Sequence, residues 1–457
     1  MKHTDIKVLL NDETLIGSEV TVCGWVRTAR DSKNVAFIEL NDGTCFTNIQ
    51  LVVDKAKFTE EQVKEFMPVG TSVRAIGKLV ASDRNGVEME LSEIEVLGAC
   101  PADYPLQKKR HSMEFLRTIP HLRVRTRYFE AVMAIRNQLS FAIHTYFHKN
   151  GYKYVHAPIL TGSDCEGAGE MFRVTTQPWN ANYDSEEEYF ENDFFGKKAG
   201  LTVSAQLEGE MAAMGLGRIY TFGPTFRAEN SNTPRHAAEF WHVEPEVCFA
   251  DINDIIDIAE EFIKYIIKDV LENCPEEMAF FNQWVEKGII EKLENVIAHD
   301  FAKVSYTEAV DILQKSGKKF DYKVEWGCDL QTEHEKYLTD EHFKKPVFVV
   351  DYPADIKSFY MKRNPDGKTV AATDLLVPGI GEIIGCSERE ADLETLKKAM
   401  LDRNMPLEAY QEYIDTRKFG SVPHSGFGLG FERILMYITG VSNIRDAIMF
   451  PRTVGNL

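Results

Sequence analysis

The segment FRAENSNTPRHAAEFWHVEPE, residues 226–246, groups arginine, histidine and glutamate side chains with aromatic rings. Its flanks have the residue pattern of strands, which predicts a strand–loop–strand unit. Arg227 is a forked donor suited to a phosphate or a carboxylate, and Phe240 offers a flat face to a nucleotide base. Arg235 and His236 fall on the loop, where they can meet outer phosphates. The pattern favours a nucleotide site built from arginines, although Arg–Glu pairs of this kind are also common as salt bridges.

A second segment, TDLLVPGIGEIIGCSER at residues 373–389, carries carboxylates at Asp374 and Glu382. These are suited to Mg²⁺, which needs only one or two protein ligands beside phosphate oxygens. Arg389, at the end of the segment, can pair with a substrate carboxylate. The chain has no Walker A motif, since the DGKT stretch lacks the upstream glycine. A nucleotide site in this chain therefore has to rely on arginines and a metal ion.

A third segment, HSGFGLGFERILMYITG at residues 424–440, has glycines at alternate positions of a predicted strand that ends at Gly430. Alternating glycines let a flat ligand approach the backbone, or simply let two strands pack closely. Glu432 and Arg433 open the helix that is predicted to follow.

Composition narrows the class of protein. The 457 residues are enough for two or three domains, and 44% of them are hydrophobic and 27% charged. The net charge of −19 argues against indiscriminate nucleic-acid binding. Residues 108–127 nevertheless carry seven Lys or Arg, which predicts a solvated linker or a hinge beside a phosphate backbone. We find no apolar run long enough for a membrane and no signal-peptide core, so we expect a cytoplasmic protein.

The first 100 residues contain five short β-patterned stretches, with a longer spacer of helical character before the fourth. This count and spacing predict a small closed β-barrel of the OB type, a fold that binds single-stranded nucleic acid by stacking bases on aromatic side chains. Phe37 and Gln50 lie on the stretches that would supply the binding face. A phenylalanine in the barrel core is an equally good reading of Phe37.

From Arg127 the hydrophobic period becomes helical, and Asn150-Gly151 is a plausible stop. Strands and helices then alternate without a regular βαβ rhythm, which predicts an α+β domain. Residues 253–343 are mostly helical in pattern, with Asp251 as the predicted N-cap of the first helix. The acidic, aromatic stretch around residues 184–193 is predicted to be a surface loop.

Together these segments resemble the class II aminoacyl-tRNA synthetases. GYKYVHAP, residues 151–158, resembles motif 1; FRAE and RHAAEFWHVEPE resemble motif 2; GFGLGFER resembles motif 3. In this order and at this separation the three motifs are specific for the family. A barrel ahead of such a core is the arrangement of the subgroup for aspartate, asparagine and lysine. The resemblance thus covers nearly the whole chain.

The resemblance implies a domain plan. Residues 1–102 would form an OB-fold anticodon-binding domain, 103–126 a hinge, and 127–457 a class II catalytic domain of α+β type with an antiparallel sheet. A helical insertion would occupy roughly residues 253–343. The motif 1 region from Gly151 to Pro158 would join two subunits in a homodimer.

The resemblance also implies roles at an ATP site. Arg227 would contact the α-phosphate, Phe240 would stack on adenine, and Arg433 would hold the terminal phosphates, with Mg²⁺ on Glu382 and Asp374. Arg227, Glu382 and Arg433 would be the catalytic residues. The residues expected to contact ATP are Arg227, Glu229, Arg235, His236, Phe240, Glu382, Gly430 and Arg433.

The choice of amino acid depends on TVSAQLEGE, residues 202–210. Members specific for aspartate typically have a lysine at the position of Gly209, which here carries no charge. Glu210 follows and would accept from the side-chain NH₂ of asparagine and repel aspartate. The chain therefore resembles the bacterial members that use asparagine. The residues expected around the amino acid are Glu166, Ser204, Gln206, Glu210, Glu244 and Arg389.

The activity implied is the ATP-dependent attachment of asparagine to tRNA(Asn) through an aminoacyl-adenylate. The barrel would read the anticodon through Arg27, Arg30, Phe37 and Gln50. Three alternatives stay open at this point. They are an aspartate-charging enzyme of relaxed specificity, a non-catalytic RNA-binding paralogue, and an asparagine synthetase built on the same core.

Overall fold

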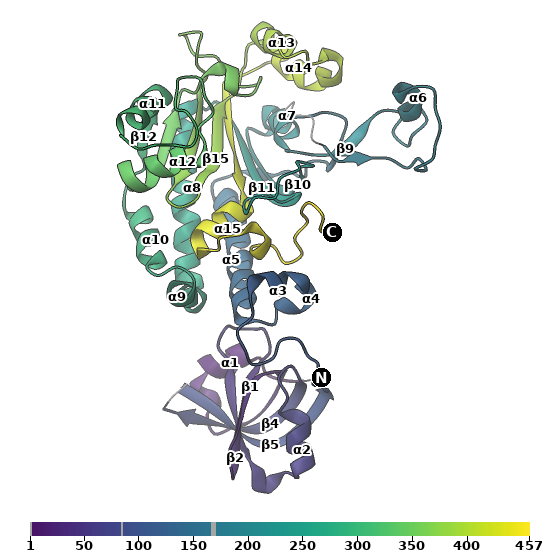
Figure 1. Cartoon of the computed structure of the whole chain (residues 1–457), viewed down its shortest axis with the longest axis vertical. Coiled ribbons are helices and arrows are strands. Elements are labelled where there is room, and N and C mark those ends of the chain that lie inside the picture. The colour runs from purple at the N-terminus through teal and green to yellow at the C-terminus, as the bar shows by residue number, and fades with distance from the viewer. Residues whose placement is uncertain (1, 84–85, 166–170) are drawn as a thin grey trace. The chain divides into compact units, whose positions relative to one another are not determined.

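The computed structural model of the chain, shown in Figure 1, describes residues 2–83, 86–165 and 171–457. The chain divides into two compact units, Met1–Ala134 and Ile135–Leu457. The division falls inside helix α5 (Arg127–Lys149), so the domain limits expected from the sequence stay predictions.

The first unit is built around the predicted barrel. Its strands are β1 (Glu19–Asp31), β2 (Val35–Asn41), β3 (Ile49–Asp54), β4 (Ser72–Ser82) and β5 (Gly86–Gly98). They close in the order β1-β2-β3-β5-β4, with antiparallel pairs except for β3 and β5. The spacer before β4 contains helix α2 (Glu60–Phe66), which begins with a capping box between Thr59 and Gln62. The predicted five-stranded barrel is confirmed.

Strand β2 shows how the barrel sorts its side chains. Ala36, Ile38 and Leu40 have no exposed surface and belong to the barrel core, which helix α1 (Ile6–Asn11) also joins. Phe37 lies between them in sequence and is only partly buried. Because successive side chains of a strand point to opposite faces, Phe37 lies on the outer face of the barrel.

The basic segment after the barrel is not uniformly solvated. It forms helices α3 (Met113–Thr118) and α4 (Pro120–Arg123), and Arg123 is fully buried with its guanidinium carbon 4.1 Å from the centre of the Phe129 ring. The basic character of this segment therefore reflects packing as well as surface charge.

The second unit is organised by an eight-stranded sheet in the order β12-β13-β14-β15-β16-β11-β10-β6. Pairing is antiparallel except at the two edges, where β12 pairs with β13 and β6 with β10 in parallel. The predicted α+β domain with an antiparallel sheet is confirmed. The strands are β6 (Lys153–Tyr154), β10 (Arg218–Phe226), β11 (Glu239–Cys248), β12 (Ala302–Ser305), β13 (Val347–Val350), β14 (Ala372–Val377), β15 (Gly381–Glu388) and β16 (His424–Gly430).

Helix α8 (Ile252–Asn273) packs against β15 and β16. As predicted, Asp251 caps it, accepting from the backbone N–H groups of Asn253 and Asp254. Its apolar stripe recurs at helical spacing and is buried, from Ile255 to Val270. The other helices of the unit are α6 (Glu186–Glu191), α7 (Gln206–Leu216), α9 (Pro275–Trp284), α10 (Ile289–Ala298), α11 (Tyr306–Lys315), α12 (Thr332–Lys336), α13 (Leu393–Leu401), α14 (Gln411–Lys418) and α15 (Phe431–Thr439).

A small sheet in the order β7-β9-β8 stands off from the main sheet and carries α6 (Figure 1). Its strands are β7 (Leu160–Thr161), β8 (Arg173–Val174) and β9 (Ala199–Leu201). The prediction of a plain loop over the acidic stretch is wrong, because Ser185 accepts from the Glu188 N–H and starts a helix there. Glutamates in the first turn suit the positive end of a helix, so a run of acidic residues here favours the helix. Among the helices of the described residues, none is long and apolar enough to cross a membrane.

Candidate active site

A cavity of about 380 Å³ opens on the eight-stranded sheet of the second unit. This volume lies in the range of small-molecule and cofactor sites. Most of the residues singled out in the sequence line it, although they come from four separate stretches of the chain. They are Ser204, Gln206, Arg227, Glu229, Arg235, His236, Phe240, Glu244, Asp374, Glu382, Arg389, Gly430 and Arg433.

Adjacent antiparallel strands bring these stretches together. Strand β16 lies between β11 and β15, and Gly426 pairs with Glu246 on one side and with Ser387 on the other. A Cβ atom at Gly426 would lie 2.3 Å from the Glu246 carboxyl carbon. One at Gly428 would lie 2.8 Å from the His242 ring. These two glycines therefore make room for side chains of the neighbouring strand, and Gly428 and Gly430 also line the cavity.

One end of the cavity is rich in arginine. The guanidinium carbon of Arg227 lies 5.3 Å from the centre of the Phe240 ring, so the two side chains form a cation–π pair. The Nη1 atom of Arg433 donates to the Glu382 carbonyl oxygen at 3.2 Å and lies 3.7 Å from its carboxylate. The Nη2 atom of Arg235 donates to the Gly379 carbonyl oxygen at 3.4 Å. This end presents an aromatic face and three guanidinium groups to one space, which suits a base attached to several phosphates.

Carboxylates gather beside these arginines. Burial raises the pKa of Glu382, and Asp374 raises it further. Burial, Glu382 and Asp374 likewise raise the pKa of Glu335 to about 8. Lys357 donates to Asp374 at 2.6 Å, but its single positive charge does not offset the negative charge of all these carboxylates. The donor set therefore fits a divalent cation shared with phosphate oxygens, although no group of three candidate protein ligands occurs within residues 2–83, 86–165 and 171–457.

Lys357 and Glu335 were not among the residues singled out from the sequence. Lys357 lies in YPADIKSFYMK, residues 352–362, which carries none of the motifs described above. Glu335 lies on α12, far from the other carboxylates in sequence, and its carboxylate accepts from the Glu382 backbone N–H at 3.3 Å, a contact that follows from the fold alone.

The other end of the cavity holds an ordered carboxylate, Glu244. It accepts from the Ser204 hydroxyl, from the Ala205 backbone N–H at 3.0 Å and from Thr221 at 3.3 Å. Burial raises the pKa of Glu244, but His242 and these hydrogen bonds outweigh that effect and lower it to about 2. Glu244 is therefore a fixed negative charge in the wall, suited to an ammonium group.

Arg389 lies at the same end and forms a two-pronged ion pair with Glu246. Its Nε donates to one carboxylate oxygen at 3.2 Å and its Nη2 to the other, while Nη1 donates to the Ser387 hydroxyl at 2.6 Å. Burial and the nearby Glu210 and Glu244 raise the pKa of Glu246 despite Arg389, yet both oxygens accept from Arg389, which is the arrangement of an ionised carboxylate. Two of the five N–H groups of Arg389 have no partner among the described residues, and both Arg389 and Glu246 line the cavity. Glu246 was quoted in the motif but not assigned to the amino-acid site.

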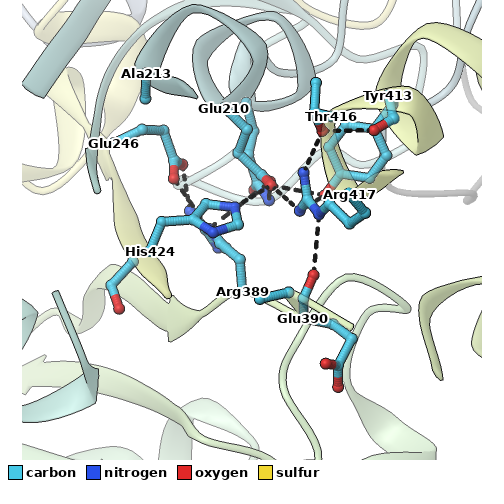
Figure 2. A network of polar contacts seen from close by, with 12 residues as sticks. Glu210, Ala213, Glu246, Arg389, Glu390, Tyr413, Thr416, Arg417 and His424 are labelled. Atoms are coloured by element: carbon cyan, nitrogen blue, oxygen red, sulfur yellow. Dashed lines mark hydrogen bonds and ion pairs between the residues drawn. The ribbon is translucent and has the colours of Figure 1, made fainter. Parts of the chain in front are cut away.

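Glu210 does not lie where the sequence suggested. It has no exposed surface and is absent from the cavity wall, and Figure 2 shows it in a network of polar groups with Arg417, Tyr413 and His424. The predicted direct contact with a substrate amide is therefore corrected, because other side chains occupy the Glu210 oxygens. Glu166 lies outside the described residues.

The four barrel residues predicted to bind the anticodon have two different kinds of surroundings. Arg30 is exposed, with its guanidinium carbon 5.7 Å from the centre of the Phe37 ring, and its Nη2 lies 3.4 Å from Gln50, so these three share one outer face. Arg27 instead donates to the Asn41 side chain at 3.1 Å and pairs with Glu130 at 3.4 Å. Arg27 is thus engaged within the unit, and its contact with the anticodon stays a prediction.

Comparison with known proteins agrees with this geometry. A family model described as tRNA synthetases class II (D, K and N) matches residues 112–454, and one described as OB-fold nucleic acid binding domain matches residues 20–97. The asparagine–tRNA ligase of Clostridium beijerinckii is 55% identical over 449 residues, which is 97% of both chains. That of Acetivibrio thermocellus is 55% identical over 99% of both chains. The crystal structure of asparaginyl-tRNA synthetase from Pyrococcus horikoshii complexed with asparaginyl-adenylate superimposes with a TM-score of 0.88 at 35% identity, covering 100% of this chain and 99% of that one.

Proposed function

Since this chain belongs to the class II tRNA synthetases of the aspartate, lysine and asparagine group, we propose that it joins asparagine to tRNA(Asn). The reaction runs through an asparaginyl-adenylate, which is also the ligand of the Pyrococcus horikoshii structure. The observation that carries the choice of amino acid is the Arg389–Glu246 pair in the cavity wall.

An arginine paired with a glutamate matches a side-chain amide. The remaining N–H groups of Arg389 would donate to the amide oxygen of asparagine, and Glu246 would accept from its NH₂ group. An aspartate carboxylate in the same place would face the Glu246 carboxylate, with no proton between them. The pair therefore binds asparagine and rejects aspartate by charge.

The ATP end would be used for activation. The asparagine carboxylate is already anionic, so its attack on the α-phosphate needs no general base, and catalysis comes from positioning and charge stabilisation. Arg227 would hold the α-phosphate, Phe240 the adenine ring, and Arg433 the terminal phosphates of the departing pyrophosphate. Glu229, Arg235 and His236 line the same part of the cavity.

Asp374 and Glu382 would hold Mg²⁺, which when bound neutralises phosphate charge. At the amino-acid end, the fixed negative charge of Glu244 would take the substrate ammonium group, with Ser204 and Gln206 beside it. In the second step the terminal ribose of the tRNA takes the asparaginyl group and AMP leaves.

Two surfaces of the protein would bind macromolecular partners, one for tRNA and one for a second subunit. The shared outer face of Arg30, Phe37 and Gln50 supports anticodon binding by the barrel, with Phe37 stacking on a base. The motif 1 region exposes Tyr154 and neighbouring apolar side chains, which supports a homodimer through residues 151–158. An enzyme that acts on tRNA would be located in the cytoplasm.

Pyrophosphate exchange into ATP tests the activation step. The purified chain is supplied with labelled pyrophosphate and with either asparagine or aspartate, and tRNA charging follows as the second assay. Exchange with asparagine alone is expected. Exchange with aspartate would support the enzyme of relaxed specificity, and no exchange with either amino acid would support the non-catalytic paralogue. Formation of free asparagine from aspartate and ammonia would instead support an asparagine synthetase.

A further inference from the structure

Glu210 is the centre of a buried network that joins three elements of the second unit. It lies on α7 and accepts from Arg417 and Tyr413 of α14, the latter at 2.7 Å. His424 of β16 contacts the same oxygen through Nε2 at 3.0 Å. The side chains of Glu210, Arg417 and His424 have no exposed surface, and Figure 2 shows Arg417 and His424 converging on the Glu210 carboxylate.

The network keeps Glu210 ionised. His424 Nδ1 lies 2.8 Å from the Val422 carbonyl oxygen, and Nε2 faces the carboxylate. Because both neighbours are acceptors, both ring nitrogens are placed to donate. Burial raises the pKa of Glu210, but Arg417, His424 and Arg389 outweigh it, so the pKa is held well below its ordinary range.

The second oxygen of Glu210 faces the cavity side. It accepts from Gln206 Nε2 at 2.9 Å and lies 3.8 Å from Arg389 Nε. An ionised carboxylate can only accept, so the NH₂ group of Gln206 has to point toward Glu210. The carbonyl oxygen of Gln206 is then the end that is left for a ligand, and Gln206 lines the cavity.

We propose that Glu210 is a positioning residue for amino-acid selection, which fixes the direction of the Gln206 amide and holds Arg389 from behind. The inference rests on the proposed function, since Gln206 and Arg389 are the residues assigned there to asparagine. Through Gln206, Glu210 presents an acceptor to the donating groups of the substrate. Through its charge beside Arg389, it lowers the attraction of that guanidinium for an aspartate carboxylate.

The substitution Glu210→Gln keeps the shape of the side chain and removes its charge. The amide at 210 can donate as well as accept, so Gln206 is no longer forced to one orientation. We expect the KM for asparagine in pyrophosphate exchange to rise roughly tenfold to a hundredfold, the effect of removing one hydrogen bond to a charged group. The KM for ATP should change little. The preference for asparagine over aspartate in kcat/KM should fall by roughly tenfold.

A purely structural role for Glu210 predicts a different result. Loss of folding would lower the amount of active enzyme and hence kcat, with both KM values unchanged. The matched control is Glu260→Gln, which removes the charge of a carboxylate paired with Lys264 at 2.7 Å, away from the cavity. Its KM values should equal those of the unsubstituted chain.

Two further variants keep the inference open to refutation if Glu210→Gln does not fold. Tyr413→Phe removes a single hydroxyl donor to Glu210 and should raise the KM for asparagine in the same direction, by a smaller factor. Gln206→Met should make the effect of a change at Glu210 smaller than it is in the unsubstituted chain, because the two act through one hydrogen bond. Unchanged KM for asparagine and unchanged preference in folded Glu210→Gln or Tyr413→Phe would overturn the positioning role. Absence of asparagine-dependent exchange in the unsubstituted chain would overturn the proposed function instead.

Discussion

Replacing Glu246 by glutamine tests whether charge at the end of the cavity selects the amide. Glu246→Gln preserves the shape of the side chain and one acceptor for Arg389. In the unsubstituted chain the Glu246 side chain is 1% exposed and that of Arg389 is 4% exposed, so solvent screens their interaction weakly. An aspartate bound there would place two carboxylates next to each other.

The size of the effect follows from this geometry. Two like charges about 4 Å apart repel by about 4 kcal/mol at an effective dielectric constant of about 20. Some of this repulsion is offset because Arg389 attracts both carboxylates, so we expect aspartate to gain about 2–3 kcal/mol, or roughly 30–150-fold in kcat/KM. Asparagine loses a charged acceptor but can still donate to the glutamine oxygen, so its loss should be near tenfold, about 1.4 kcal/mol. The selectivity should therefore fall by roughly 300-fold or more.

The assay is pyrophosphate exchange with asparagine and aspartate at matched concentrations, with thermal unfolding measured in parallel. The variant should melt at a lower temperature, because removing one charge of a buried pair leaves Arg389 incompletely paired. Glu260→Gln again serves as the control, with unchanged selectivity. If Glu246→Gln is folded and its ratio of asparagine to aspartate activation equals that of the unsubstituted chain, the charge argument is refuted.

Further predictions concern the barrel, the glycine strand and pH. Phe37→Ala should raise the KM for tRNA in the charging assay and leave pyrophosphate exchange intact, and equal losses in both assays would remove Phe37 from the RNA-binding face. Gly426→Ala should abolish asparagine-dependent exchange, since its Cβ would lie 2.3 Å from the Glu246 carboxyl carbon, whereas Gly223→Ala, with no atom within 4 Å of the added Cβ, should be active. The raised pKa of Glu335, about 8, means that the folded state holds this proton more tightly than the unfolded chain does. Stability without Mg²⁺ should therefore fall as pH rises from about 5 to about 8, and Glu335→Gln should flatten that dependence in thermal unfolding.

Local patterns were sufficient for most of the fold. The alternation of side chains in the barrel strands, the N-cap at Asp251 and the turn from the glycine strand into the helix at Phe431 depend on near neighbours in sequence. The acidic helix α6 was missed because its glutamates suggested solvent exposure. Glutamates also favour the first turn of a helix, and Ser185, the N-cap of α6 in the structure, is of a residue type that commonly caps helices.

The sequence predicted which residues form the site better than it predicted how they are arranged. Arginines, carboxylates and the aromatic ring of the motifs do line one cavity, because each motif fixes its own strand. The sequence did not separate Glu210 from Glu246, since both are acidic residues near the predicted amino-acid site. Only the folded structure shows that Glu246, on strand β11, lines the cavity and that Glu210, on helix α7, does not. Lys357 and Glu335 depend on contacts between distant segments, which no local pattern records.

The charge of the whole cluster explains why the position of Gly209 matters. Three buried carboxylates face two guanidinium groups and two imidazole rings, those of His242 and His424, so the carboxylates and their partners are already matched before a substrate enters. The carboxylates are Glu210, Glu244 and Glu246, and the guanidinium groups are Arg389 and Arg417. A neutral amide keeps that balance, whereas a carboxylate substrate adds one negative charge and requires one more positive group. A Cβ at Gly209 would lie 3.4 Å from Glu246 Cγ, so a lysine there would begin its side chain beside the carboxylate that reads the substrate. With glycine at position 209, the cluster thus lacks the additional positive charge that an aspartate substrate would need.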